Sequence, residues 1–160
     1  QRRTPPAPGH LGTSAGLVGF MGGGGMAGLI IPADLWGLVQ AHAGRCLPEE
    51  ACGLLAGLDG CVQMCYEITN TLHSATRFRM DAQEQVRAFM DFEQRGLELL
   101  AIYHSHPAGP LEPSSTDLVE FAYPGVLYLI LTLSAGEWQG RVFVIDKTLV
   151  SEVPLQRISA

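Results

Sequence analysis

The sequence is poor in charged residues, especially basic ones, and in long apolar runs. Charged residues make up 16% of the 160 residues against 47% hydrophobic ones, which excludes the apolar-poor composition of disordered chains. Ten Lys and Arg face sixteen Asp and Glu, so no basic surplus can neutralise phosphates, and we expect no nucleic-acid partner. No run approaches the roughly 18 apolar residues of a membrane-spanning helix, so no membrane partner is expected either.

The sequence also lacks a recognisable redox motif among its cysteines. An even count would allow disulfides, but no two of the four form a C-x-x-C pair: Cys46, Cys52, Cys61 and Cys65. The last two lie four apart in a strand-like segment, which puts both on one face. We interpret the four as small buried hydrophobic residues rather than metal ligands, and we expect a cytoplasmic location.

Residues 1–27 differ in composition from the rest of the chain and are expected to form a flexible Gly/Pro-rich N-terminal tail. A proline-rich segment and the run Gly22–Gly25 are typical of extended or flexible chain. Arg2 and Arg3 could begin a signal peptide, but proline, glycine and histidine interrupt the apolar stretch after them. The folded domain is therefore expected over residues 28–160.

Two helices are predicted from apolar residues at helical spacing and from end signals. Pro32 suits the first turn of one helix. Asp81 is expected to cap the other, which runs to about Arg95 and ends at Gly96. The core side of this second helix is assigned to four apolar residues: Val86, Phe89, Met90 and Phe92.

Strands are predicted from apolar or alternating runs between turn signals. Asp59-Gly60 is a hairpin signal between two of them. Residues 77–80 alternate and are expected to be half-buried. The predicted strands cover 26–31, 51–58, 61–68, 99–103, 126–133, 138–145 and 150–158. This mixture of hairpins and helices predicts an α+β fold, three-layer αβα-like, with a mixed β-sheet flanked by helices.

The residues that carry chemistry lie at the end of one buried strand and in the segment after it. His104 and His106 are two apart, so in a strand both imidazoles face one point, and Pro107 ends the strand there. Asp117 falls in the first turn of a short helix that Ser114 is expected to begin, and its carboxylate can turn back to the strand end. Zinc takes such N/O ligands and keeps a fourth position for water.

Ordinary structural roles remain open for each of these patterns taken alone. Ser-x-x-Asp is also a helix-capping box, and a His-x-His pair can lie on an exposed strand. The occurrence of both patterns across a loop rich in proline and glycine favours the metal site.

A hydrolytic zinc site also needs a general base, usually a carboxylate from a separate element. Glu49 and Glu50 precede the apolar strand predicted over 51–58, where desolvation would raise the pKa of a carboxyl group. Acidic residues before a strand can also be merely solvated. The residues alone do not choose between Glu49 and Glu50.

Together these patterns resemble the motif of the JAMM (JAB1/MPN+) zinc metalloprotease family, in its small stand-alone prokaryotic type. The family pattern is a Glu before a Gly-rich strand, then His-Ser/Thr-His-Pro, then Ser-x-x-Asp after a gap of seven residues. Here residues 107–113 form that gap, and residues 50–57 match Glu-x-x-Gly-x-x-x-Gly. The resemblance covers about 29–158, selects Glu50 as the base, and implies the JAB1/MPN (cytidine-deaminase-like) fold.

The resemblance also implies a role for each residue at a motif position. His104, His106 and Asp117 would be the ligands of Zn²⁺. Glu50 would be catalytic, taking a proton from a zinc-activated water and passing it to the leaving amine. Ser114 would also be catalytic, stabilising the oxyanion beside its helix-capping role.

The implied activity is that of a metallopeptidase acting on a ubiquitin-like protein. Family members hydrolyse the peptide or isopeptide bond after its C-terminal Gly-Gly, and small prokaryotic members act on ubiquitin-fold sulfur carriers. Asn70 and the segment 77–81 fit this subgroup. We expect the substrate's C-terminal tail to bind extended beside the active-site strand. A homodimer is left open.

Two other functions remain as alternatives, and the residues around the motif are interpreted as structural or solvent-exposed. The chain could be a zinc amidohydrolase acting on small peptides, or a non-catalytic MPN interaction module. Ser105, between the two histidines, is interpreted as a structural brace for the strand or loop. Arg77 and Arg79 are interpreted as exposed residues, with pairing to acidic groups of a partner as the alternative.

Overall fold

The computed structural model describes residues 27–114, 125–147 and 149–159. The elements in these residues are β1 (Leu29–Pro32), α1 (Ala33–Cys46), β2 (Cys52–Leu58), β3 (Cys61–Ile68), α2 (Ala82–Gln94), β4 (Glu98–His106), β5 (Leu127–Ser134), β6 (Glu137–Asp146), β7 (Leu149–Val153) and β8 (Leu155–Ile158). The tail predicted over 1–27, its last residue excepted, and the helix predicted after Ser114 lie outside the described residues. No helix among those described is long and apolar enough to cross a membrane.

The strands form one mixed sheet with a helix on each face. Its order is β7-β6-β5-β4-β2-β3-β1-β8, and the central β4 is parallel to β5 and antiparallel to β2. Tyr103 and Ile102 are neighbours on β4 and so face opposite sides. Tyr103 belongs to the core cluster that includes Val39 of α1, and Ile102 belongs to the cluster that includes Ala88 of α2. The predicted α+β class, a mixed sheet flanked by helices, is confirmed.

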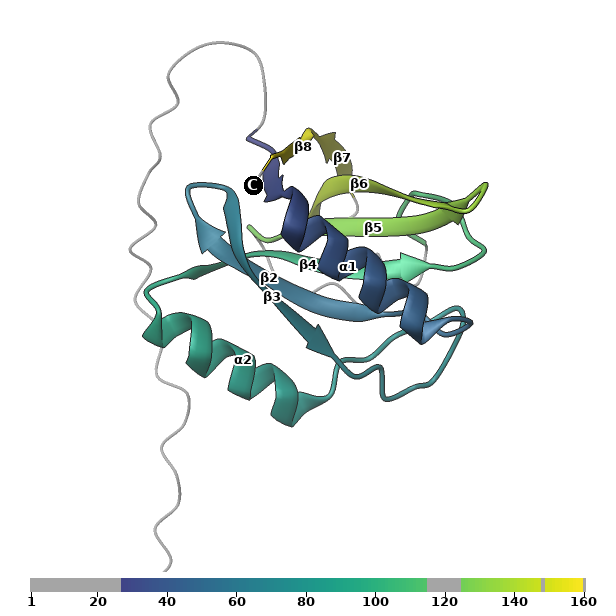
Figure 1. Ribbon diagram of the computed structural model, residues 1–160, viewed down its shortest axis with the longest axis horizontal. Helices are drawn as coiled ribbons and strands as arrows, with labels where there is room; N and C mark the ends of the chain where they lie inside the picture. Colours follow the sequence, from purple (N-terminus) through teal and green to yellow (C-terminus); the bar gives the residue numbers. More distant parts are fainter. Residues whose placement is uncertain (1–26, 115–124, 148, 160) are drawn as a thin grey trace, which may run out of the picture.

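The sheet curls until its two edges meet. β7 and β8 lie at opposite ends of the strand order, yet only Pro154 separates them in sequence, and they adjoin in Figure 1. The Leu29 N–H donates to the carbonyl oxygen of Pro154 at 2.9 Å, which fastens β1 at this corner. The prediction of one strand over 150–158 is therefore wrong, because proline lacks the N–H that a continuous ladder needs.

Two glycines of the β2 motif occupy positions that admit no side chain. A Cβ on Gly53 would overlap the Tyr103 ring and the carbonyl oxygen of Tyr66. A Cβ on Gly57 would overlap the carbonyl oxygen of Cys61. These glycines therefore allow β2 to pack closely against β3 and β4. This close packing fixes where the chain before β2 enters the sheet.

Helix α2 has the predicted boundaries but a different buried face. The Asp81 side chain accepts a hydrogen bond from the Glu84 N–H at 2.9 Å, as expected of an N-cap. Its buried residues are Ala88 and Phe92. Val86 and Met90 are 58% and 57% exposed, so assigning them to the core side is wrong. Each lies two residues before a buried one, about 200° around the helix axis.

The four cysteines are free thiols, but only Cys52 is buried; Cys46, Cys61 and Cys65 are partly exposed, so interpreting all four as buried residues is wrong for these three. Cys52 is fully buried, and burial raises the pKa of its thiol to about 12. Burial likewise raises the pKa of Cys65 to about 11. Both thiols are therefore uncharged at neutral pH and poor nucleophiles.

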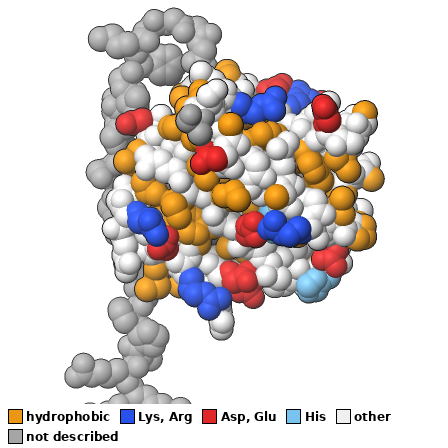
Figure 2. Space-filling view, in the orientation of Figure 1, with side chains coloured by type: hydrophobic (Ala, Val, Ile, Leu, Met, Phe, Trp, Pro, Cys, Tyr) orange, Lys and Arg blue, Asp and Glu red, His pale blue; other side chains and the backbone are white. Residues whose placement is uncertain are grey.

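Charges of both signs are interspersed on the face seen in Figure 2, where blue groups lie beside red ones. The ion pairs of the described residues include Arg45–Glu67, Arg95–Asp91 and Arg141–Glu152. Their side chains are a third or more exposed, so these pairs contribute little to stability.

Candidate metal centre and active site

The end of β4 brings two histidine side chains together. His104 and His106 are buried, and their Nε2 atoms are 3.0 Å apart. Their burial follows from the sheet, because β4 pairs with β2 as far as His104 and with β5 as far as His106. The strand alternation predicted that the two imidazoles would face one point, and the structure places them so.

Neighbouring groups fix the orientation of each imidazole. Phe78 stacks on the His104 ring, with ring centroids 4.6 Å apart and an interplanar angle of 26°. His106 donates a hydrogen bond from Nδ1 to the carbonyl oxygen of Pro110 at 2.7 Å. A neutral imidazole protonated on Nδ1 keeps its lone pair on Nε2, so His106 presents an acceptor toward His104.

This pair fits two positions of a zinc site. Nitrogen ligands about 2.0–2.1 Å from a tetrahedral zinc ion lie about 3.3 Å apart, close to the observed 3.0 Å. Zinc-binding histidines usually donate a hydrogen bond from the ring nitrogen that does not bind the metal, often to a backbone carbonyl oxygen. His106 makes such a bond from Nδ1 to the Pro110 carbonyl oxygen. The third expected ligand, Asp117, lies outside the described residues, and within these no three His, Cys, Asp or Glu side chains form a metal-holding group.

A buried carboxylate reaches the histidine pair from the chain before β2. Glu50 is 3% exposed, and its Oε1 lies 4.0 Å from Nε2 of His106. Glu49 turns the other way, with Oε2 3.2 Å from Nδ1 of the exposed His73. The residues alone did not choose between these two adjacent carboxylates. In the structure Glu50 is buried and faces His106, whereas Glu49 is partly exposed and faces His73.

Ser105 connects the histidine strand to the chain beside Glu50. Its Oγ accepts a hydrogen bond from the Ala51 N–H at 2.8 Å, and its own N–H donates to the Ala51 carbonyl oxygen at 3.0 Å. Ser105 is fully buried and faces away from the histidines flanking it. Its interpretation as a brace is confirmed, and what it braces is the residue after Glu50.

Replacing Ser105 by alanine is expected to lower the free energy of unfolding by about 1–3 kcal/mol, because the buried Ala51 N–H loses its side-chain acceptor. Urea unfolding measures this difference. Ser134→Ala, at an exposed strand position, is the matched control and should change stability by less than about 0.5 kcal/mol. Equal effects of the two substitutions would contradict the bracing role.

A cavity of about 240 Å³ opens beside the histidines and the carboxylate. Small side chains form most of its wall, and Ser114 also lines it. The lining residues are Glu50, Ala75, Thr76, His106, Ala108, Gly109, Pro110 and Ser114. Four of the five predicted site residues are described, and the structure gathers all four around this cavity and the His104–His106 pair.

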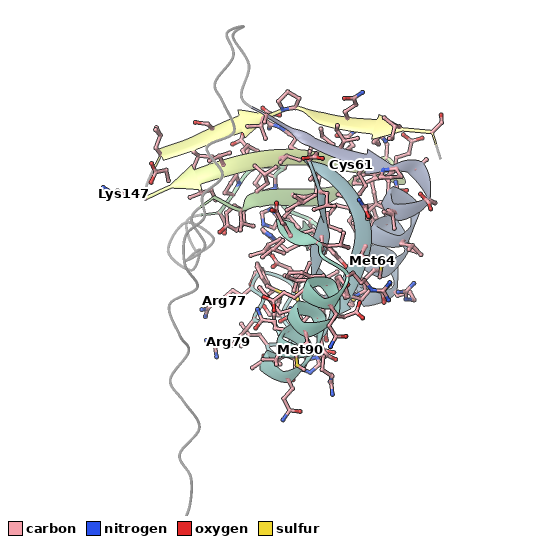
Figure 3. The ribbon with its side chains drawn as sticks, turned by 90° about the vertical axis from the view of Figure 1, so that its left-hand side faces the viewer. Cys61, Met64, Arg77, Arg79, Met90 and Lys147 are labelled. Atoms are coloured by element: carbon pink, nitrogen blue, oxygen red, sulfur yellow. The ribbon has the colours of Figure 1, made fainter. Side chains whose placement is uncertain are left out.

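Two residues beside the site were not singled out from the sequence. Phe78 lies in the alternating segment 77–80, where Arg77 and Arg79 are exposed and extend from the same side of the molecule (Figure 3). That alternation placed Phe78 inward without indicating that it meets a histidine. Thr132 Oγ lies 2.8 Å from the carbonyl oxygen of His106 and steadies the turn after β4; no local pattern marks it.

Comparison with known proteins adds relatives that cover most of the chain. Residues 32–145 match the family described as prokaryotic homologs of the JAB domain. The CysO-cysteine peptidase of Mycobacterium tuberculosis is 37% identical over 130 residues, which are 79% of this chain and 89% of that protein. The desampylase of Pyrococcus furiosus is 36% identical over 66% of this chain and 74% of its own length. Both names denote hydrolases, which supports a hydrolase activity.

Solved structures of similar fold agree with these relatives. Protein DSY2949 from Desulfitobacterium hafniense is 34% identical, with a TM-score of 0.76, over 82% of this chain and 94% of its own. AF2198, a JAB1/MPN domain protein from Archaeoglobus fulgidus, is 18% identical, with a TM-score of 0.53, over 83% of this chain and 99% of its own. The predicted JAB1/MPN fold is confirmed.

Proposed function

Because the chain belongs to the family of prokaryotic JAB-domain proteins, we propose that it is a zinc-dependent peptidase acting on a ubiquitin-like sulfur-carrier protein. The bond cleaved is the peptide or isopeptide bond after the carrier's C-terminal Gly-Gly. The observation that carries the proposal is that His106, paired with His104, and the buried Glu50 carboxylate line one cavity together.

His104, His106 and Asp117 would hold the zinc ion. When bound, zinc acts as a Lewis acid that lowers the pKa of a water molecule toward neutrality. His106 is prepared for this role by its Nδ1–H bond to Pro110, which leaves Nε2 to bind metal.

Glu50 is the proton-transfer group of the proposed reaction. Its carboxylate is buried beside His106 and lines the cavity, so it can take a proton from the attacking water. The same carboxyl group then gives that proton to the departing amine nitrogen as the C–N bond breaks. Burial protects this exchange from bulk solvent.

Ser114 is proposed to steady the substrate's carbonyl group. It lines the same cavity as Glu50 and His106, where its hydroxyl can donate a hydrogen bond to the oxygen on which negative charge develops.

The cavity supports a substrate with small residues next to the cleaved bond. Ala75, Thr76, Ala108 and Gly109 form its wall, and their short side chains leave room for an extended backbone. A Gly-Gly terminus adds no side chain of its own and fits such a passage. The names of the two relatives, a CysO-cysteine peptidase and a desampylase, also favour a ubiquitin-like conjugate as substrate.

The test is to incubate the protein with a ubiquitin-fold carrier that ends in Gly-Gly followed by a short C-terminal extension. We expect mass spectrometry to show cleavage after the second glycine, loss of cleavage with a zinc chelator, and recovery when zinc is returned. Cleavage that survives the chelator would contradict a metal-dependent peptidase. Equal cleavage of short peptides without the ubiquitin fold would favour a small-peptide amidohydrolase instead.

A further inference from the structure

The main chain of Glu50 is held by the loop that follows β3, residues 70–79. The Glu50 N–H donates to the carbonyl oxygen of Ser74 at 2.8 Å. The Glu50 carbonyl oxygen accepts from Nδ2 of Asn70 at 3.1 Å. Both polar groups of the Glu50 backbone therefore bind this loop, whereas those of Ala51 bind Ser105.

The Asn70 side chain is the point where the loop is closed. It is 7% exposed, and its two polar atoms, Nδ2 and Oδ1, each make two hydrogen bonds. Nδ2 donates to the carbonyl oxygens of Glu50 and Arg77, at 3.1 and 3.0 Å. Oδ1 accepts from the N–H groups of Leu72 and Arg79, each at 3.1 Å. One amide thus connects both arms of the loop to Glu50 and uses its whole hydrogen-bonding capacity.

The same loop supplies other parts of the site. Phe78 stacks on His104, and Ala75 with Thr76 forms part of the cavity wall. The loop therefore contacts the proposed base, one proposed zinc ligand and the substrate cavity. A change in how Asn70 closes the loop therefore reaches Glu50 directly, through the Asn70 Nδ2 hydrogen bond, and indirectly, through the bond from the Glu50 N–H to the Ser74 carbonyl oxygen.

We propose that Asn70 is a positioning residue for hydrolysis, which sets the place of the Glu50 carboxylate relative to the histidine pair. The inference rests on the proposed function. Asn70 lies away from the cavity lining and acts through the Glu50 backbone, so its contribution concerns the proton-transfer step. A base displaced by about 1 Å can lose about 100-fold in rate.

Asn70→Asp is the sharpest substitution, because it preserves shape and the acceptor Oδ1. It replaces the donor with an oxygen that faces the carbonyl oxygens of Glu50 and Arg77. Asn70→Ala removes the same bonds without that repulsion, and both variants are assayed below their unfolding temperatures. Thr71→Val is the matched control, since Thr71 Oγ1 donates to the Arg79 carbonyl oxygen within the same loop, whereas the Asn70 side chain donates directly to Glu50.

We expect both Asn70 variants to lower kcat about 10–100-fold while KM changes less than about twofold. Thr71→Val should change kcat by less than about twofold. Two readouts do not depend on turnover. The Kd of the uncleaved carrier for Glu50→Gln and for Glu50→Gln/Asn70→Asp should agree within about twofold, and zinc affinity from chelator competition should be unchanged within about threefold.

An unchanged kcat in both Asn70 variants would overturn the inference while leaving the proposed function intact. Losses in carrier binding or zinc affinity that match the loss in kcat would also overturn it, because they indicate a general structural role. A loss in Thr71→Val as large as in the Asn70 variants would have the same meaning. An inactive wild-type protein would instead defeat the proposed function on which the inference rests.

Discussion

Replacing Glu50 by glutamine is expected to lower kcat by about 10²- to 10⁴-fold, the usual contribution of a positioned general base. Glutamine has nearly the same volume and keeps a polar group at the buried position beside His106, but it cannot accept and release a proton at neutral pH. The fold and the zinc content should be retained, because the carboxylate is not among the proposed ligands. Single-turnover cleavage of the extended carrier measures the loss.

Glu49→Gln is the control for this substitution, since it makes the same chemical change one residue earlier. Glu49 is partly exposed and contacts His73 rather than the histidine pair. Its replacement should change kcat by less than about twofold. Similar losses in the two variants, or a Glu50→Gln protein of near wild-type rate, would contradict the assignment of the base.

Replacing His106 by alanine is expected to remove both zinc and activity. His106 is held by Pro110 with its Nε2 directed at His104, so the substitution deletes one of two converging nitrogen donors. Loss of a group that only hydrogen-bonds to a metal ligand typically weakens metal binding about 10–100-fold. Loss of the ligand itself should weaken zinc binding by more than this. Metal analysis after dialysis measures zinc content, and the carrier assay measures the fall to background.

His73→Ala is the control for the loss of a histidine. The His73 side chain is 67% exposed and contacts Glu49, so its removal should alter neither zinc content nor rate. If the His106→Ala protein kept its full zinc content after dialysis, the proposed centre would be wrong.

Locally determined features of the fold were predictable from the sequence. The Asp59-Gly60 turn has positive φ at both residues, 51° and 75°, as the hairpin signal requires. Helix α2 begins at the Asp81 cap and ends before Gly96, whose φ is 72°. Each of these features depends on a few neighbouring residues, so the sequence alone carries the information.

Features that depend on distant parts of the chain were not predictable. The exposure of Val86 and Met90 is decided by which face of α2 meets the sheet, and helical spacing allowed two faces. The break at Pro154 was visible in the sequence. However, β7 pairs with β6 and β8 pairs with β1, so the two strands lie at opposite ends of the sheet. This arrangement was not predictable, because β6 and β1 are more than a hundred residues apart in the sequence.

The candidate site shows the same division. Strand alternation sufficed to place His104 beside His106. Choosing Glu50 over Glu49 needed the family resemblance, because both carboxylates precede the same strand; the fold then showed which one faces inward. Phe78 reaches the site from a loop distant in sequence. Asp117 lies outside the described residues and stays a prediction.

The central claim is most directly tested by titrating zinc into metal-free protein while following cleavage of the extended carrier in the same samples. We expect the rate to rise in proportion to bound zinc and to reach a plateau at about one zinc ion per chain. Samples of Glu50→Gln should bind the same amount of zinc and remain nearly inactive. A rate independent of zinc, or a plateau without zinc bound, would contradict the claim.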